Sequence, residues 1–322
     1  MKTPAIRRTP PAIYRRAGDR AFQTLIVALG SVVILLAAAL AGVLLRDGWM
    51  AFETFGPLRF LVSRDWDAVR GSFGALPFLI GTLITSVAAL LLSLPPALAV
   101  AVFTAEYAPR WLGTIIDYLV DLLAAVPSVV VGIWGIFVLV PLVQQRIYMP
   151  LYLWAGENAP NLLPILGAPA GYNLTTATLI LALMIVPYTV ALARDAIRLV
   201  PADQREAAFA LGATRWEVIW MAVLPYARGG IIAGAVLSFG RAIGETMAVA
   251  MLVGNSSRLP FTLFGPAATM PSVIVNEFRE AVENLHLSSL MAVGFYLLLI
   301  SLAVNLFAAY LQRRLAVGGR TT

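Results

Sequence analysis

Residues 76–104 read LPFLIGTLITSVAALLLSLPPALAVAVFT and carry no charged side chain. An α-helix needs only about 20 apolar residues to cross the roughly 30 Å hydrocarbon core of a bilayer, so this run is long enough to span a membrane. Five further runs qualify or nearly qualify, near residues 22–45, 114–141, 174–194, 228–253 and 288–311. The sequence therefore predicts an all-α integral membrane protein with six transmembrane helices.

The composition excludes an ordinary soluble domain. Of the 322 residues, 60% are hydrophobic and 12% are charged, and the mean hydropathy is +0.84. Soluble domains carry about twice that charged fraction, because charged side chains cover their surface. Here the charges lie in short stretches between the apolar runs, so lipid is the expected solvent for most of the chain.

The basic residues predict the orientation of the spans. Fifteen of the 23 lysine and arginine residues lie in the two tails, 1–21 and 312–322, and in or beside the segments that follow the second and fourth spans. Because positive charge accumulates on the cytoplasmic side, both termini are expected in the cytoplasm, flanking a membrane domain of residues 22–311. The first apolar run is longer than the h-region of a secretory signal, so an uncleaved anchor is expected.

Several enzyme classes are excluded by residue types that the sequence lacks. Lys2 is the only lysine and no Gly-rich run resembles a phosphate-binding P-loop, so any ATPase must reside on a separate chain. The sequence has no cysteine and one histidine, which leaves no metal cluster and no thiol nucleophile. We therefore expect a protein that is not an enzyme and has no cofactor on this chain.

The longest polar segment on the predicted cytoplasmic side, residues 201–225, reads PADQREAAFALGATRWEVIWMAVLP. Its turn and capping residues predict two short helices. Asp203 can cap the first helix, and Gly212 suits the left-handed residue that ends it. Thr214 and Glu217 form a capping box at the start of the second helix.

The second of these helices places Trp216, Ile219 and Trp220 on one face. The rings either lie in the interfacial belt of the bundle, where Trp is common, or fill a groove of a soluble partner. Pro225 is expected to separate this helix from the fifth span. A helix-turn-helix that reads DNA is excluded, since the two helices carry a net negative charge.

Arg241 and Glu245 lie inside the apolar run of residues 228–253. Arg241 is predicted about 15 Å deep, where insertion costs at least roughly 2.5–3.5 kcal/mol, so its side chain should face a cavity or a partner. Glu245 follows on the same helix face and is the nearest candidate partner. The pair either locks the bundle, or the guanidinium fork binds an oxyanion on a translocation path. Close helix approach is indicated by Gly230, Gly234, Gly240 and Gly244.

The string Glu206-Ala207-Ala208, with Gly212 and the terminal Leu224-Pro225, resembles the EAA loop of ABC importer permeases. This resemblance implies a type I ABC importer permease fold in which the loop of about residues 195–227 forms cytoplasmic coupling helices. It also implies that these helices dock in a groove of a cytoplasmic ATPase. The implied coupling residues are Glu206, Ala207, Gly212, Trp216, Glu217 and Trp220.

Three further segments are similar to the C-type permease family of bacterial phosphate-specific (Pst) ABC importers: FGRAIGETMAV at 239–249, LAAVPSV at 123–129 and GIWG at 132–135. The resemblance implies that Arg241, Glu245 and Ser128 line a phosphate path through the inner membrane. It also implies a second homologous permease, two ATP-binding subunits and a periplasmic phosphate-binding protein as partners. Sulfate and molybdate permeases share the Arg-x-x-Gly-Glu element, so a permease of that type stays an alternative. An ATP-independent secondary anion transporter or channel is a second alternative.

Three other features are left open at this level. Asp117 and Asp121 form an acidic pair near the cytoplasmic mouth of the third span, and they are solvated, bonded to neighbouring helices or part of a gate. His286 is expected in an exposed loop just outside the last span. Prolines within the spans predict kinks or hinges at Pro95, Pro96, Pro127 and Pro187.

Overall fold

The computed structural model describes residues 12–315. Residues 1–11 and 316–322, which belong to the predicted tails, lie outside the described part of the chain. Within residues 12–315 the regular elements are helices, and no strand occurs beyond isolated bridges. Six helices are long and apolar enough to cross a membrane, so the predicted all-α fold is confirmed. They cover Gly18–Asp47, Leu76–Tyr107, Ser128–Asn158, Leu174–Arg198, Arg215–Gly244 and Asn284–Leu311.

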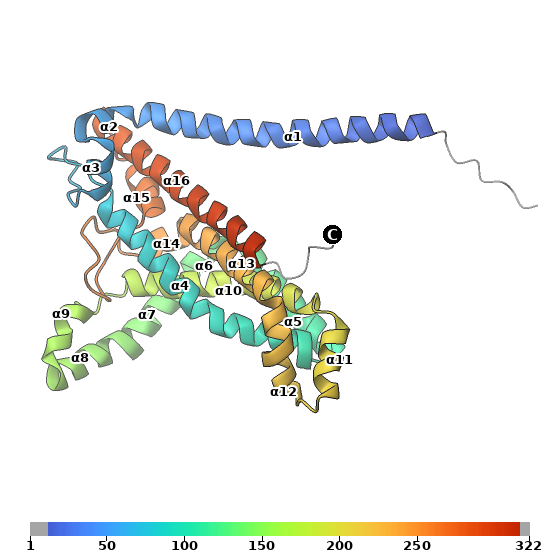
Figure 1. Cartoon of the computed structure of the whole chain (residues 1–322). Helices are drawn as coiled ribbons and strands as arrows, with labels where there is room; N and C mark the ends of the chain where they lie inside the picture. The colour runs from blue at the N-terminus through green and yellow to red at the C-terminus, as the bar shows by residue number, and fades with distance from the viewer. Residues whose placement is uncertain (1–11, 316–322) are drawn as a thin grey trace, which may run out of the picture.

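Helix α10 (Leu174–Arg198) forms the centre of the bundle (Figure 1). It packs against α4 (Leu76–Val102), α5 (Arg110–Ala125) and α13 (Leu224–Gly244), and α13 in turn packs against α16 (Asn284–Leu315). In the most apolar stretch of α10, 67% of the residues are buried inside the protein, more than in any other candidate span. Protein neighbours rather than lipid therefore surround α10.

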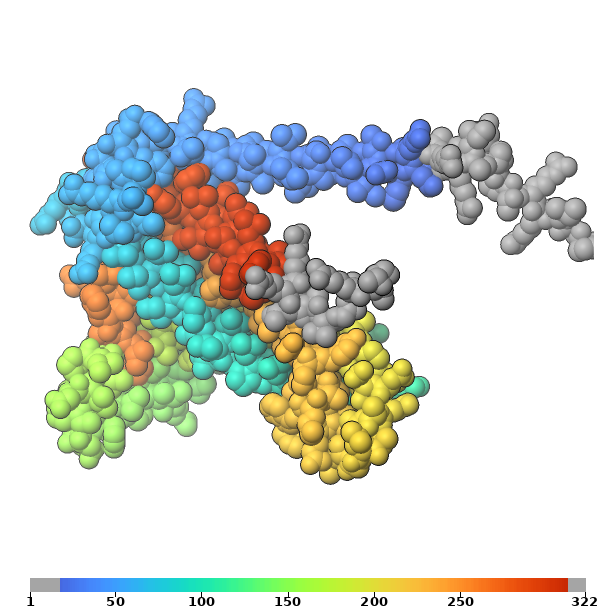
Figure 2. Space-filling model, in the orientation of Figure 1, coloured from blue at the N-terminus to red at the C-terminus, as the bar shows by residue number. Residues whose placement is uncertain are grey.

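Short helices occupy the two ends of the bundle (Figure 1). At one end, α2 (Trp49–Phe55), α3 (Pro57–Val62) and α15 (Met270–Glu277) surround the start of α16. At the opposite end, α11 (Ala202–Ala210) and α12 (Arg215–Val218) form a lobe that projects from the bundle (Figure 2). A second projection near the start of α10 is made by α7 (Val140–Val143), α8 (Met149–Asn158), the 3₁₀ turn Pro160–Leu162 and α9 (Leu163–Leu166).

Helix α1 (Ala12–Asp47) extends away from the rest of the chain (Figures 1 and 2). None of its most apolar stretch is buried, and its contact with the bundle is at its C-terminal end, where Gly48 lies against Ala292 of α16. The predicted first span of residues 22–45 lies within this helix, which starts at Ala12 rather than near residue 22. An apolar helix without protein cover requires lipid or another chain around it.

The third span is not the continuous helix over 114–141 that the sequence predicts. α5 ends at Ala125, Val126 and Pro127 are extended, and a new helix begins at Ser128. That helix continues through α6 (Ser128–Trp134), η2, α7 and η3 to the end of α8 at Asn158. The physical reason is Pro127, which lacks an N–H donor and disfavours helical geometry at the residue before it. Pro127 therefore breaks the span instead of kinking it.

The fifth span also differs from the predicted helix over 228–253. α13 ends at Gly244, Glu245 adopts an extended conformation, and α14 (Met247–Leu252) begins after Thr246. The Thr246 hydroxyl donates to the carbonyl of Gly244 at 3.0 Å, which satisfies a backbone acceptor that the helix end leaves free. The third and fifth spans are thus both discontinuous. The helices that follow the two breaks, α6 and α14, pack against each other.

Each π turn in residues 12–315 ends two residues before a proline. These turns are η1 (Phe103–Tyr107) before Pro109, η2 (Gly135–Leu139) before Pro141, η3 (Gln144–Tyr148) before Pro150 and η5 (Ile219–Val223) before Pro225. In η5 the N–H of Leu224 donates to the carbonyl of Ile219, five residues back. A proline ring collides with the carbonyl four residues before it, so a wider preceding turn lets the helix continue through Pro141, Pro150 and Pro225. The helix that contains η1 instead ends at Tyr107, before Pro109. Pro225 consequently does not separate α12 from α13, contrary to the prediction, and one helix covers Arg215–Gly244.

His286 is not the exposed loop residue that the sequence predicts. It lies in the first turn of α16 and is buried. Its Nε2 is 2.9 Å from Oε2 of Glu277, which also accepts a hydrogen bond from the indole of Trp66 at 2.8 Å. The His286 ring stacks on Phe73 at 5.1 Å between centroids. The residue therefore joins α15, α16 and the segment before α4.

Candidate functional site

The turn between α11 and α12 has the geometry that its glycine predicts. Gly212 has a φ of +83°, in the left-handed region where a side chain is strained. Its N–H donates to the carbonyl of Phe209 at 2.9 Å, and the N–H of Ala213 donates to that of Ala208 at 3.2 Å. This pair of hydrogen bonds is a Schellman motif, and it fixes the direction in which α12 leaves α11.

The predicted caps of the two short helices have different outcomes. The capping box of α12 is present: the Thr214 N–H donates to Oε2 of Glu217 at 2.7 Å, and the Glu217 N–H donates to Oγ1 of Thr214 at 3.4 Å. Asp203 as the cap of α11 is wrong. Pro201 stands at the N-cap, and Asp203 lies in the first helical turn without a capping bond. Because α11 begins at Ala202, Asp203 lies inside the first turn, where its carboxylate favours the positive end of the helix dipole.

The two tryptophans of the lobe are exposed, whereas the isoleucine between them is not. Trp216 and Trp220 are 59% and 56% exposed, and their ring centroids are 5.6 Å apart in an edge-on arrangement. Ile219 is buried, and together with both tryptophans it lines one apolar cavity against α4, so the three side chains share one face as predicted. Further exposed apolar side chains lie in the same segment of the chain, and we call the whole set the coupling face: Phe209, Leu211, Trp216, Trp220 and Met221.

Arg241 lies near the C-terminal end of α13, at the point where the fifth span breaks. Its guanidinium carbon is 4.2 Å from the ring centroid of Tyr188 on α10. The Tyr188 hydroxyl donates at 2.8 Å to the carbonyl of Ala124, in the last turn of α5. The ring of Tyr188 thus joins Arg241 to the break in the third span.

Arg241 lines a cavity of about 410 Å³ between α5, α6 and α10. The other lining side chains are apolar apart from Tyr188, and they include Val120, Leu123, Val130, Trp134, Met184 and Pro187. Among residues 12–315, Arg241 is the only charged residue on the cavity wall. The Arg241 side chain is exposed, so its guanidinium is accessible to an anion.

Glu245 and Ser128, the other two predicted pathway residues, do not line this cavity. Within residues 12–315 no carboxylate forms an ion pair with Arg241, so the predicted pairing with Glu245 is wrong. The two side chains do not pair because α13 ends at Gly244, so Glu245 no longer lies on the helix face that carries Arg241. Ser128 is half-buried at the first position of α6.

The glycines of α13 divide into two groups. A Cβ added to Gly230 or Gly234 would lie 2.5 or 2.7 Å from the Cβ of Ala196 or Leu192 on α10. These two positions confirm the predicted close approach of helices. A Cβ added to Gly240 would lie 3.4 Å from Oδ1 of Asn305 on α16, which is also a close approach. Gly244 has no atom within 4 Å, so the prediction fails at that position.

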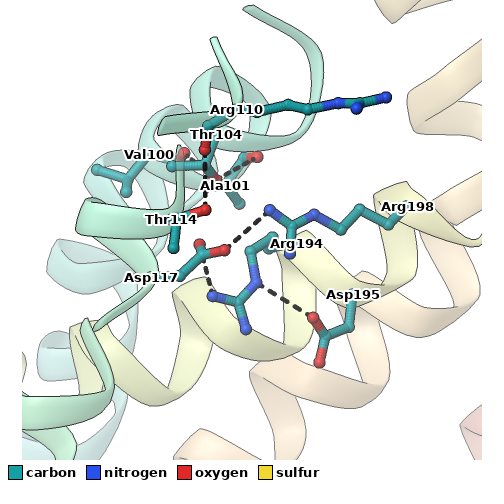
Figure 3. Close-up of polar contacts among 9 residues, drawn as sticks. All are labelled: Val100, Ala101, Thr104, Arg110, Thr114, Asp117, Arg194, Asp195 and Arg198. Carbon is teal, nitrogen blue, oxygen red and sulfur yellow. Dashed lines mark hydrogen bonds and ion pairs between the residues drawn. The ribbon is translucent and has the colours of Figure 1, made fainter. Parts of the chain in front are cut away.

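A charged network joins α5 to α10 near the coupling helices (Figure 3). Asp117 contacts Nη1 of Arg194 at 2.7 Å and Nη2 of Arg198 at 2.9 Å, and Arg194 also contacts Asp195 at 3.1 Å. Asp117 is therefore bonded to a neighbouring helix, one of the readings left open, whereas Asp121 is exposed.

Sequence reasoning missed both Arg194 and Tyr188. The arginines at 194 and 198 share a helix face one turn apart, as do the two acids of α5, and this matching spacing is a usable signal. Tyr188 gave no such signal, because a single tyrosine in an apolar run is compatible with many positions.

The model of the family described as "Binding-protein-dependent transport system inner membrane component" matches residues 97–317. The chain belongs to this family. Among its relatives, the phosphate transport system permease protein PstC of Pasteurella multocida is 44% identical over 272 residues, which are 84% of each chain. PstC of Mesorhizobium japonicum is 40% identical over 315 residues, 97% of this chain and 96% of that protein. These matches confirm the resemblance to C-type permeases, and the protein is a multi-pass inner membrane permease.

Solved structures support the permease fold. A bacterial alginate ABC transporter in complex with an alginate-bound periplasmic protein matches with a TM-score of 0.59 and 16% identity, over 94% of this permease and 98% of that chain. An inward-facing MetNI methionine ABC transporter matches with a TM-score of 0.55 and 14% identity, over 73% of this permease and 93% of that chain. At such low identity the likeness concerns the fold alone.

Proposed function

We propose that this permease forms half of the translocation path of an ATP-driven importer of inorganic phosphate. The observation that carries the proposal is Arg241, a guanidinium without a carboxylate partner on the wall of an apolar cavity. An arginine presents a planar fork of N–H donors that matches a tetrahedral oxyanion, and it keeps its charge at every physiological pH. The identity to proteins named phosphate transport system permease supports phosphate as that oxyanion.

The surroundings of Arg241 suit transient rather than permanent binding. A cation against an aromatic face gains about 0.5–2 kcal/mol, which holds the guanidinium in place without neutralising it. A carboxylate partner would compete with a passing anion for the same donors. We infer that Ser128 and Glu245, at the two helix breaks, approach the path when the permease changes conformation.

A second, homologous permease completes the path in this proposal. The cavity is open, and its walls on α5 and α6 carry exposed apolar side chains such as Leu123, Val130 and Trp134. The uncovered α1 adds a further apolar surface. Exposed apolar surface of this extent marks a protein interface or a lipid contact. The heterodimer itself follows from the family resemblance.

The coupling face is the proposed docking site of a separate cytoplasmic ATPase. Its two tryptophans are exposed aromatic anchors of the kind that dominate binding energy at protein interfaces. Glu206 and Ala207 lie on α11 and Glu217 lies on α12, and Gly212 forms the turn between these two helices. Two ATP-binding subunits on the cytoplasmic side and a phosphate-binding protein on the periplasmic side complete the importer, with no cofactor on this chain. A secondary transporter or channel has no need of such a face.

Uptake of radioactive phosphate into proteoliposomes that hold the whole transporter tests the function. We expect Arg241→Gln to abolish uptake while the complex still assembles, since removing a charge does not burden membrane insertion. Arg241→Lys should also fail, because an ammonium lacks the fork. Arg228→Gln, an exposed arginine at the other end of α13, is the matched control. Wild-type uptake by the Arg241→Gln transporter contradicts the site, and stronger inhibition by sulfate than by unlabelled phosphate contradicts the substrate.

A further inference from the structure

Arg205 of the coupling helix α11 is hydrogen-bonded to the ends of two transmembrane helices. Its Nη2 donates to Oε1 of Glu106 at 2.7 Å, and its Nε donates to the same oxygen at 3.1 Å and to Oε2 at 3.4 Å. Glu106 lies in η1, which continues α4. The same guanidinium donates to the carbonyl of Ile197 at 3.0 Å and to that of Val200. One side chain of α11 therefore contacts both α4 and α10.

The chemistry of this contact makes it stiffer than an ordinary surface pair. The side chains of Arg205 and Glu106 are only 22% and 12% exposed, so water screens their attraction less than on an open surface. The guanidinium fork holds the carboxylate with two nitrogens, which fixes the orientation as well as the distance. The carbonyls of Ile197 and Val200 lie at and just beyond the C-terminal end of α10, where the helix dipole favours a cation.

α11 has little other contact with the bundle besides the Arg205–Glu106 pair. None of the side chains of α11 is buried, and its apolar contact with the core beneath is limited to small side chains such as Ala208. By contrast, α12 continues without interruption into α13 and so into Arg241. α12 is thus joined to Arg241 by one continuous helix. α11 has no such helix, and its connection to the bundle is the Arg205 contact.

We propose that Arg205 is a positioning residue that passes the movement of α11 to α4 and α10, with Glu106 as its partner. When the ATPase displaces the lobe, the Arg205–Glu106 pair moves the cytoplasmic ends of both helices together. α10 then carries the displacement to Tyr188, which holds Arg241. The inference rests on the proposed function, because it assumes that the lobe receives force from an ATPase.

The test compares phosphate uptake with ATP hydrolysis in proteoliposomes that hold the complete transporter. In Arg205→Gln and in Glu106→Gln we expect uptake to fall about tenfold while ATP hydrolysis and subunit composition stay near wild type, as for the loss of a typical coupling free energy. The double variant should be no worse than either single variant, because the two side chains act as one pair. Arg110→Gln, an exposed arginine beyond η1 without an ion pair, is the matched control and should behave as wild type.

The outcomes separate this inference from the proposed function. Unchanged uptake per ATP in both single variants overturns the inference, and so do losses that multiply in the double variant. Release of the ATPase from either variant also overturns it, because the pair would then serve docking rather than transmission. If the wild-type permease binds no ATPase at all, the proposed function itself fails, and that result is visible before any variant is made.

Discussion

The guanidinium of Arg241 lies against the ring of Tyr188, which in turn is bonded to the backbone of Ala124. The ring and the hydroxyl of Tyr188 therefore make two different contacts. The ring face orients the charge, and the hydroxyl ties α10 to the last turn of α5. A phenylalanine retains the first contact and loses the second, whereas a leucine loses both. The side chain can therefore be dissected by two substitutions.

We predict that Tyr188→Leu lowers the maximal rate of phosphate uptake about tenfold, within the range that the loss of a partly desolvated cation–π contact allows. Tyr188→Phe should lose less, at most about fivefold, since a lost neutral hydrogen bond costs about 1 kcal/mol. Both rates are measured in proteoliposomes at saturating binding protein. Equal losses in the two variants would show that the hydroxyl, and not the ring, is the functional part.

Gly234 provides a prediction for packing at a single residue. An alanine Cβ there would lie 2.7 Å from the Cβ of Leu192, a position that is fixed to the backbone and cannot yield. Overpacking of this kind costs about 1–3 kcal/mol. Gly234→Ala should therefore lower the melting temperature of the detergent-solubilised transporter, whereas Gly42→Ala, with no atom within 4 Å, should not. An unchanged melting temperature for Gly234→Ala would mean that α10 and α13 pack less closely than described.

At the scale of the helices, the break at Val126–Pro127 positions α5 and α6 around the cavity. Pro127→Ala restores the missing N–H donor, so we expect α5 and α6 to merge into one helix. Spin labels on Tyr118→Cys and Phe137→Cys should then lie about 28 Å apart, because a straight helix rises about 1.5 Å per residue between the two positions. Uptake should fall with the complex intact. Pro150→Ala, beyond η3, is the control and should leave uptake unchanged, and a Pro127→Ala transporter with normal uptake contradicts a role for the break.

How much of this could be predicted from the sequence depends on the kind of signal. The six apolar runs, the left-handed Gly212 and the capping box at Thr214 follow from local chemistry, and the structure contains them. The break after Gly244 does not, because an apolar run with one glutamate reads as helix on both sides of it. His286 was misplaced because its partner Glu277 comes from a different helix, and only tertiary structure brings them together. The cavity wall of Arg241 is likewise built from segments that are distant in the chain.

At the scale of the whole molecule, the coupling lobe and the aromatic end around His286 lie at opposite ends of the bundle (Figure 1). Five arginines, at positions 194, 198, 205, 215 and 228, lie in or beside the segment that contains α11 and α12, and by the positive-inside rule they predict that this end is cytoplasmic. Arg241 lies between the two ends, near the breaks of two spans. Phosphate that passes Arg241 toward the lobe would therefore move into the cell. With the opposite orientation, the same movement would export phosphate.

The last prediction concerns this orientation and uses the absence of cysteine from the sequence. Gln204 on α11 and Asp65 near α3 are both exposed, so a cysteine placed at either position should be accessible from its own side of the membrane. We expect a membrane-impermeant maleimide to label Asp65→Cys in spheroplasts and to label Gln204→Cys only after the membrane is permeabilised.

Labelling of both variants in permeabilised membranes is the control for folding and reactivity. Labelling of Gln204→Cys in intact spheroplasts would contradict the orientation, because a lobe outside the cell has no access to ATP-driven subunits in the cytoplasm. The same labels test cover by the ATPase: with the complete complex present, the cysteine at position 204 should react more slowly than in the permease alone, since a docked subunit excludes reagent from the lobe.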